Sequence, residues 1–192
     1  MTKFRQILFI YVLLSLATVT NLATRVNADT LPNKVYLPIV LNPPCLTAAE
    51  EAQLAQLLGQ DPQQQRPSLT CNYILAQVAR ARAADMAERK YFSHVNPDGY
   101  GPNYLVEQAG YVLPDYYGDD PKANYIESIA AGNSTATATW QQQWMNSPSH
   151  REHLLGLNDF YKNQIEYGIG YAYDPDSPYK YYWVVITAQP GP

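Results

Sequence analysis

The residues of this sequence best suited to chemistry are its histidines and one isolated glutamate. His94 follows an aromatic pair and precedes Asn-Pro-Asp-Gly, a strong turn signal, so its imidazole can project into a cleft. Glu127 lies between two isoleucines, where a carboxylate needs a partner or a functional reason. His150 and His153 are three positions apart, so they lie on nearby faces of one helical turn.

Two neutral imidazoles and one carboxylate are donor types that suit a zinc ion with an open fourth position for water. The same groups could work as an acid–base pair without metal. A structural interpretation stays open as well: His94 suits the end of a helix, and a buried His–Glu–His network can simply order loops. The sequence contains neither a Gly-x-Ser-x-Gly elbow nor an H-E-x-x-H signature, so it presents no conventional nucleophile or zincin site.

The N-terminus has the pattern of an export signal. Lys3 and Arg5 precede an apolar run, and small residues end at Ala28, which predicts a signal peptide over residues 1–28. An uncleaved membrane anchor is the alternative, but the apolar run is short for a spanning helix, and no later segment is apolar enough to span. The prediction is therefore a secreted, extracellular protein without a transmembrane segment in its mature chain.

The charge of the chain argues against nucleic acid as a partner. The 13 Lys and Arg residues fall to 10 when Lys3, Arg5 and Arg25 are removed with the signal peptide, against 17 Asp and Glu. The resulting formal charge of −7 leaves no excess of basic residues, and a nucleic-acid-binding surface needs one.

The two cysteines, Cys45 and Cys71, both follow the predicted signal peptide. An even number of cysteines in an exported chain indicates a disulfide, and two free thiols are the alternative. The separation lacks the Cys-x-x-Cys spacing of a metal site. In the chain-entropy model such a bond contributes about 3 kcal/mol to stability.

The elements expected to position these residues are several helices followed by a β-hairpin. Apolar periodicity, caps and turn residues predict helices over about 47–59, 71–90, 103–110, 134–146 and 148–155. Residues 164–173 and 179–187 flank a Pro- and Asp-containing turn and read as an antiparallel hairpin. Gly168 and Gly170 fall on one face of its first strand, where they would let another element approach closely.

Four blocks of sequence carry a resemblance to a known family. They are FSHVNPDG at 92–99, IESIA at 126–130, WMNSPSHR at 144–151 and YGIG at 167–170. Together they resemble the bacterial branch of the CAP superfamily (cysteine-rich secretory, antigen 5 and pathogenesis-related 1 proteins), whose domain is also called SCP. The resemblance implies an α+β fold, an α-β-α sandwich with a small, mostly antiparallel sheet between helical layers. We therefore expect a signal peptide at 1–28, an extended Pro-containing arm at 29–44 and a CAP/SCP domain at 45–192.

The resemblance also implies a central cavity lined by histidines and acidic residues. By motif position His94, Glu127 and His150 match the family's cavity residues, and His94 and His150 become the candidate metal ligands, with zinc as the candidate ion. Two positions depart from the family pattern: Ile126 and Ser128 stand where the Gly and Asn flanking the glutamate are usual. Animal and plant members carry a further glutamate, for which this chain offers no equivalent.

The family has no agreed catalytic activity, and some members bind sterols, other lipids or metal. We therefore expect a secreted module that binds a lipid, cell-envelope or protein ligand. The alternative is a metal-dependent hydrolase acting on cell-envelope or extracellular material. A purely structural role for the trio is the third interpretation.

Overall fold

The computed structural model describes residues 44–192. The predicted signal peptide and all but the last residue of the predicted arm lie outside the described residues. Within residues 44–192, no helix combines the length and the apolar composition needed to cross a membrane.

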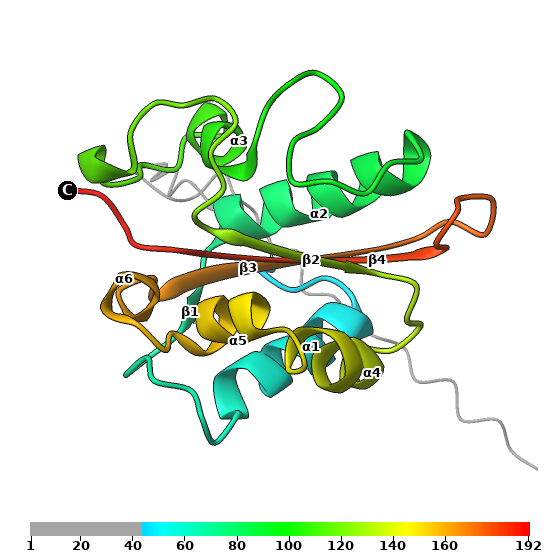
Figure 1. The fold of residues 1–192 in the computed structure, drawn as a ribbon, viewed down its shortest axis with the longest axis horizontal. Coiled ribbons are helices and arrows are strands. Elements are labelled where there is room, and N and C mark those ends of the chain that lie inside the picture. Colours follow the sequence, from blue (N-terminus) through cyan, green and yellow to red (C-terminus); the bar gives the residue numbers. More distant parts are fainter. Residues whose placement is uncertain (1–43) are drawn as a thin grey trace, which may run out of the picture. The chain divides into compact units, whose positions relative to one another are not determined.

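A four-stranded sheet forms the middle layer of the domain (Figure 1). Its strands are β1 (Thr70–Cys71), β2 (Glu127–Ala131), β3 (Glu166–Tyr173) and β4 (Tyr181–Ala188). They lie in the order β1-β3-β4-β2, with β1 parallel to β3 and the other pairs antiparallel. The predicted hairpin is therefore confirmed as β3–β4, and β2 forms one edge of the sheet.

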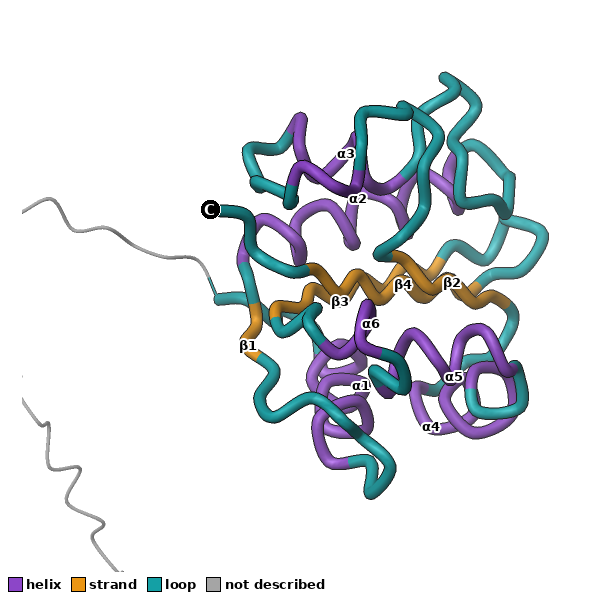
Figure 2. The backbone as a smooth tube through the Cα atoms, turned by 60° about the vertical axis from the view of Figure 1, so that its left-hand side comes forward, coloured by secondary structure: helices purple, strands orange, loops and turns teal. Residues whose placement is uncertain are grey.

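Helices cover both faces of this sheet, as the tube view shows (Figure 2). One face carries α2 (Tyr73–Glu88) and α3 (Pro102–Gln108). The other face carries α1 (Ala49–Gln60), α4 (Ala136–Ala138), a π-helical turn η3 (Thr139–Trp144), α5 (Pro148–Leu155) and α6 (Asp159–Lys162). A 3-10 turn η2 spans Asp115–Tyr117. The predicted α+β sandwich, with a mostly antiparallel sheet between helical layers, is confirmed.

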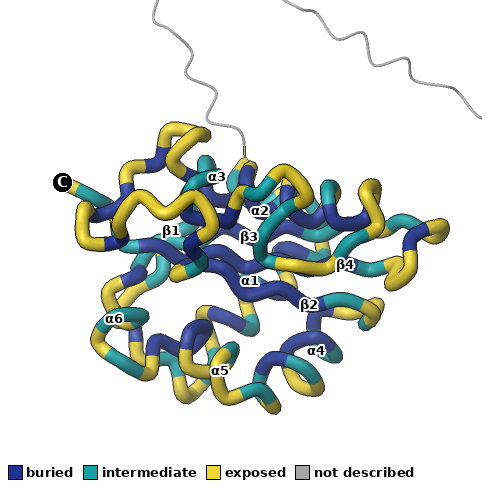
Figure 3. Tube along the Cα trace, turned by 45° about the horizontal axis from the view of Figure 1, so that its top comes forward, coloured by how far each residue is buried: buried dark blue, intermediate teal, exposed yellow. Residues whose placement is uncertain are grey.

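Two hydrophobic clusters fill the spaces between the layers, and the strands between them are the most buried part of the trace (Figure 3). Alternate residues of β4 point to opposite faces: Val184 and Ile186 pack toward α2, while Trp183 and Val185 pack toward α1 and α5. Strand β4 thus contributes to both clusters, which explains why it reads as an almost continuous apolar run.

The close approach of α2 to β3 depends on the two predicted glycines. A Cβ at Gly168 would lie 2.1 Å from the carbonyl carbon of Leu75, and one at Gly170 would lie 2.2 Å from that of Ala79. No side chain can replace hydrogen at these distances without moving the backbone. The sequence prediction for these glycines is confirmed.

The outer edge of β2 is covered by side chains rather than by another strand. The Asn124 side chain bonds both the N–H and the carbonyl of Glu127. Farther along the strand, Trp144 Nε1 donates to the carbonyl of Ile129, and Gln143 Nε2 donates to that of Ala131. These bonds satisfy backbone groups that an edge strand otherwise leaves to water.

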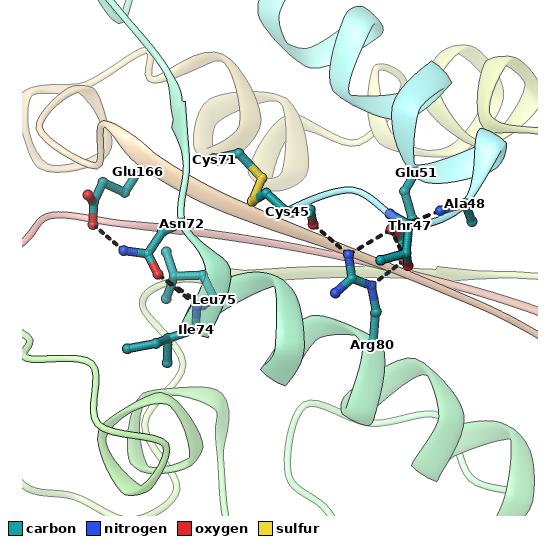
Figure 4. Close-up of a disulfide and its surroundings, with 10 residues drawn as sticks. All are labelled: Cys45, Thr47, Ala48, Glu51, Cys71, Asn72, Ile74, Leu75, Arg80 and Glu166. Carbon is teal, nitrogen blue, oxygen red and sulfur yellow. Dashed lines mark hydrogen bonds and ion pairs between the residues drawn. A yellow bond between two sulfur atoms is a disulfide. The ribbon is translucent and has the colours of Figure 1, made fainter. Parts of the chain in front are cut away.

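The predicted disulfide between Cys45 and Cys71 is confirmed, with their Cα atoms 6.1 Å apart (Figure 4). It ties the segment before α1 to β1, at the start of α2. Arg80 strengthens the same junction because its guanidinium bonds the carbonyl of Cys45 and both carboxylate oxygens of Glu51. The covalent and ionic links together tie the start of α1 to β1 and α2.

Candidate functional site

A cavity of about 120 Å³ lies where the start of β2, the loop after α2, and α5 meet. All three histidines of the chain line it, together with Glu127 and Ser128. The structure thus brings His94, Glu127 and His150, the three residues singled out in the sequence, to one site. The remaining lining residues are Asn124, Tyr125, Ile126, Ser149 and Tyr161.

The carboxylate of Glu127 lies on the α2 face of the sheet in a buried ion pair. Arg82 Nε lies 3.0 Å from Glu127 Oε2, and Arg82 Nη2 lies 3.3 Å from Oε1. The side chains are 3% and 0% exposed. The same guanidinium bonds the hydroxyl of Tyr91 and the carbonyls of Ser93 and His94. Arg82 therefore compensates the charge of Glu127 and holds the loop that carries His94.

Glu127 also determines which nitrogen of His94 carries hydrogen. His94 Nδ1 lies 2.9 Å from Glu127 Oε1, and an oxygen of an ionised carboxylate can only accept. We therefore assign the proton to Nδ1. The second nitrogen, Nε2, then presents a lone pair. Because its side chain is 38% exposed, His94 is open to a ligand.

His150 lies on the first turn of α5, and its Nδ1 is 2.9 Å from the hydroxyl of Ser147, the N-cap residue. Burial, and secondarily the charge of His94, lower the pKa of His150. The position at a helix N-terminus favours the neutral form as well. At neutral pH the imidazole is therefore uncharged.

His153, one turn later on α5, belongs to a fully buried network on the opposite face of the sheet from Arg82. Its Nδ1 lies 2.7 Å from Ser128 Oγ and its Nε2 lies 2.7 Å from Thr187 Oγ1. Burial lowers the pKa of His153 well below its usual value, and the charge of Arg66 acts in the same direction. His153 is therefore a neutral imidazole.

Arg66 bonds both this network and the C-terminal end of α5. Its guanidinium donates to the carbonyls of His153 and Leu154 at 2.7 and 2.8 Å, and to Thr187 Oγ1 at 3.2 Å. Carbonyls in the last turn of a helix lack their usual helical partners; here Arg66 bonds both, together with Gly156 N–H on His153 and Gln64 Nε2 on Leu154, and its charge complements the helix dipole. Burial lowers the pKa of Arg66 to about 10, which still leaves it charged at neutral pH.

The donor set does not fit a zinc site of three protein ligands. Among residues 44–192, no group of three or more His, Cys, Asp or Glu side chains is arranged to hold a metal ion. Both oxygens of Glu127 already bond Arg82, and one of them also bonds His94. A zinc ion could bind Glu127 only by displacing a buried ion pair. Of the predicted donors, only the imidazoles of His94 and His150 remain available to it.

One protein family matches most of this domain. The family model for CAP, the cysteine-rich secretory protein family, matches residues 62–187. The chain belongs to the CAP family. A relative, the "Uncharacterized protein YkwD" of Bacillus subtilis (strain 168), is 28% identical over 131 residues, which is 67% of this chain and 45% of YkwD. The chain thus matches less than half the length of that protein.

Two solved structures support the same fold. An extracellular SCP-domain protein from Bacillus anthracis str. Ames is 26% identical, with a TM-score of 0.53 over 73% of this chain and 40% of that one. An outer surface protein from Borrelia burgdorferi is 18% identical, with a TM-score of 0.56 over 76% and 96% of the two chains. At this identity the second likeness concerns the fold alone.

Sequence reasoning missed Arg82, which supports Glu127 and His94 from outside the cavity, and the lining pair of Ser128 and His153. In the sequence, Arg82 looks like one more inward position of a helix, because its partner Glu127 is 45 positions away. Ser128 stands out there only as a departure from the family pattern, and His153 only as a neighbour of His150. A charged residue on an otherwise apolar helix face was the available signal for Arg82.

Proposed function

We propose that this chain is a secreted CAP-domain module that binds a small polar group in the cavity lined by His94, Glu127 and His150. The observation that carries the proposal is the gathering of all three histidines of the chain around one cavity. A protein that needed only a stable core would gain more from apolar residues at these positions, since buried polar groups must each be satisfied.

The size and lining of the cavity favour a compact, hydrogen-bonding ligand. A volume of about 120 Å³ holds a few heavy atoms. His94 Nε2 offers an acceptor, and the nearby hydroxyl of Ser149 can donate or accept. A hydroxyl group of a sugar, or the terminus of a peptide, from cell-envelope material suits these groups. An acyl chain of a lipid is too long for the cavity and finds few apolar contacts in it.

Export rests on separate support. The predicted signal peptide at 1–28, the bond between Cys45 and Cys71, and the likeness to a protein described as extracellular all favour an oxidising location outside the cell. We propose that the CAP domain works there on its own or within a longer chain.

One observation favours a second candidate, a hydrolase that uses acid–base chemistry without metal. A carboxylate that holds the Nδ1 proton of an imidazole leaves Nε2 ready to accept a proton, the arrangement of a general base oriented by an acid. His94 and Glu127 have this arrangement at 2.9 Å. The metal-dependent version of the hydrolase has weaker support, because Glu127 is committed to Arg82.

Calorimetric titration with soluble cell-wall glycopeptide fragments tests the binding function. Wild-type protein should bind them, and His94→Ala and His150→Ala should each weaken binding at least about tenfold, or about 1.4 kcal/mol. Gln53→Ala is the matched control, since Gln53 is exposed on α1 away from the cavity. Equal affinity in all four proteins would contradict the proposal. Partition into phosphatidylglycerol vesicles instead would favour a lipid ligand.

A further inference from the structure

Ser128 is the one hydroxyl of this cavity that is paired with a buried imidazole. Its Oγ lies 2.7 Å from His153 Nδ1, and the residue is 1% exposed and lines the cavity. Neither the family motifs nor the proposed binding function gives this pair a role. Its chemistry depends on which atom of the pair carries the hydrogen.

A chain of hydrogen bonds fixes that hydrogen. Gln164 Nε2 donates to the carbonyl of Tyr125 at 2.8 Å, which only accepts, so Oε1 is the acceptor end of this amide. Thr187 Oγ1 lies 2.7 Å from Gln164 Oε1 and must donate its hydrogen there. Thr187 Oγ1 therefore accepts from His153 Nε2, which must carry the ring hydrogen.

The remaining nitrogen of His153, Nδ1, consequently has a free lone pair and accepts the hydroxyl hydrogen of Ser128. Arg66 reinforces the assignment, since its donation to Thr187 Oγ1 occupies the second acceptor position of that oxygen. The result is a serine hydroxyl hydrogen-bonded to a neutral base, with a third group that orients the base. This is the relationship that activates a weak nucleophile.

We propose that Ser128 is a nucleophile, with His153 as its general base, for the transfer of a small acyl group from an activated ester. Ser128 Oγ attacks the carbonyl carbon while His153 Nδ1 takes the hydroxyl proton. The ester C–O bond breaks, the leaving oxygen takes the proton from Nδ1, and an acyl-serine and an alcohol result. Water then attacks the acyl-serine with His153 again as base, which releases the acid and restores the hydroxyl.

The volume of about 120 Å³ restricts the acyl group to a short one such as acetyl. The inference goes beyond the proposed binding function and does not depend on it. Acylation is measured as modification of Ser128, whereas ligand binding is measured as the affinity lost in the His94 and His150 variants. Failure of one therefore leaves the other standing.

The test uses p-nitrophenyl acetate with the full mature chain. Release of p-nitrophenol is followed by absorbance, and the acetylated residue is located by peptide mass spectrometry. We expect acetyl on Ser128, none in Ser128→Ala, and a rate at least about 100-fold lower in His153→Gln, the usual range for loss of a general base. Ser134→Ala is the matched control, because this exposed serine lies outside the cavity, and it should react like wild type.

Ser128→Cys covers the case in which Ser128→Ala fails to fold, because a thiol keeps the side-chain size and can still donate toward His153. It should be acetylated at the same position. Acetyl found only on lysine, tyrosine or histidine residues would overturn the proposal. So would an equal rate of Ser128 acetylation in wild type and in folded His153→Gln.

Discussion

Two successive residues of β2 build two different polar sites on opposite faces of one sheet. Glu127 points toward α2 and joins a charged network with Arg82 and His94. Ser128 points toward α5 and joins a neutral network with His153 and Thr187. Both reach the same cavity, because the edge of the sheet is where its two faces meet. Because side chains alternate between the faces of an edge strand, two successive residues can place a carboxylate and an uncharged hydroxyl next to one cavity.

The two networks differ in what satisfies them. On the α2 face a buried negative charge needs a buried positive charge, and one guanidinium supplies both the charge and the hydrogen bonds. On the α5 face the Ser–His–Thr chain itself carries no charge, although the Arg66 guanidinium bonds Thr187, so its groups donate and accept in a fixed sequence. We therefore expect the charged side to fail when one partner is removed, and the neutral side to fail when one hydroxyl is removed.

Arg82→Met should have the largest effect on stability. Removal of one partner from a buried ion pair leaves Glu127 uncompensated, which costs about 3–5 kcal/mol. Urea unfolding measures the change. Adding Glu127→Gln to Arg82→Met should recover part of the loss, because the buried charge is then gone. A loss of only a few tenths for Arg82→Met would show that the ion pair is effectively solvated.

Thr187→Val tests the network of Ser128, His153 and Thr187 on the α5 face. The substitution keeps the shape of the side chain but leaves His153 Nε2 and Gln164 Oε1 without their shared partner. It should lower the free energy of unfolding by about 1–3 kcal/mol. Thr139→Val is a matched control, since Thr139 is equally buried and its hydroxyl has no partner within residues 44–192. That control should be neutral or stabilising. Equal losses in both would argue that the network contributes nothing specific.

The pH dependence of stability should come mainly from the neutral side. Because the pKa of His153 is lowered in the folded state, the unfolded chain binds protons first as pH falls below about 6.5. Stability is fully present above that pH and decreases below it, by up to about 1.4 kcal/mol per pH unit for one histidine. His150, whose pKa is also lowered, adds a smaller part.

Folded His153→Gln should therefore show a flatter pH profile than wild type in chemical denaturation between pH 7 and pH 5. A profile as steep as that of wild type would assign the effect to other groups. This effect of His153→Gln on the pH profile of stability is distinct from its effect on the proposed acylation, because the acylation rate is measured at constant pH.

Zinc should have the smallest effect. Since Glu127 is occupied by Arg82, we expect no rise in the melting temperature as Zn²⁺ is added, whereas a ligand that binds the folded state raises it with concentration. A rise in wild type that disappears in His94→Ala and in His150→Ala would restore the prediction that these two histidines hold a metal.

Much of the fold could be predicted because its signals are local. Pro148 and Gly156 bracket α5 as expected, and Gly156 has the positive φ that ends a helix. Strand β2 was missed, since both of its faces and its edge are covered and Glu-Ser-Ile-Ala-Ala shows no alternation. In the site, the trio could be found by motif position. Its partner Arg82, and the link from His153 to Thr187, depend on non-local pairing that spacing does not reveal.

The covered edge of β2 has a consequence for how other molecules approach this domain. An open strand edge invites a partner to add a strand of its own, the route behind many peptide complexes and much aggregation. Here Asn124, Gln143 and Trp144 bond four backbone groups of this strand, namely the N–H and carbonyl of Glu127 and the carbonyls of Ile129 and Ala131. These bonds compete with recognition by strand addition, and with self-association by the same route, at this edge.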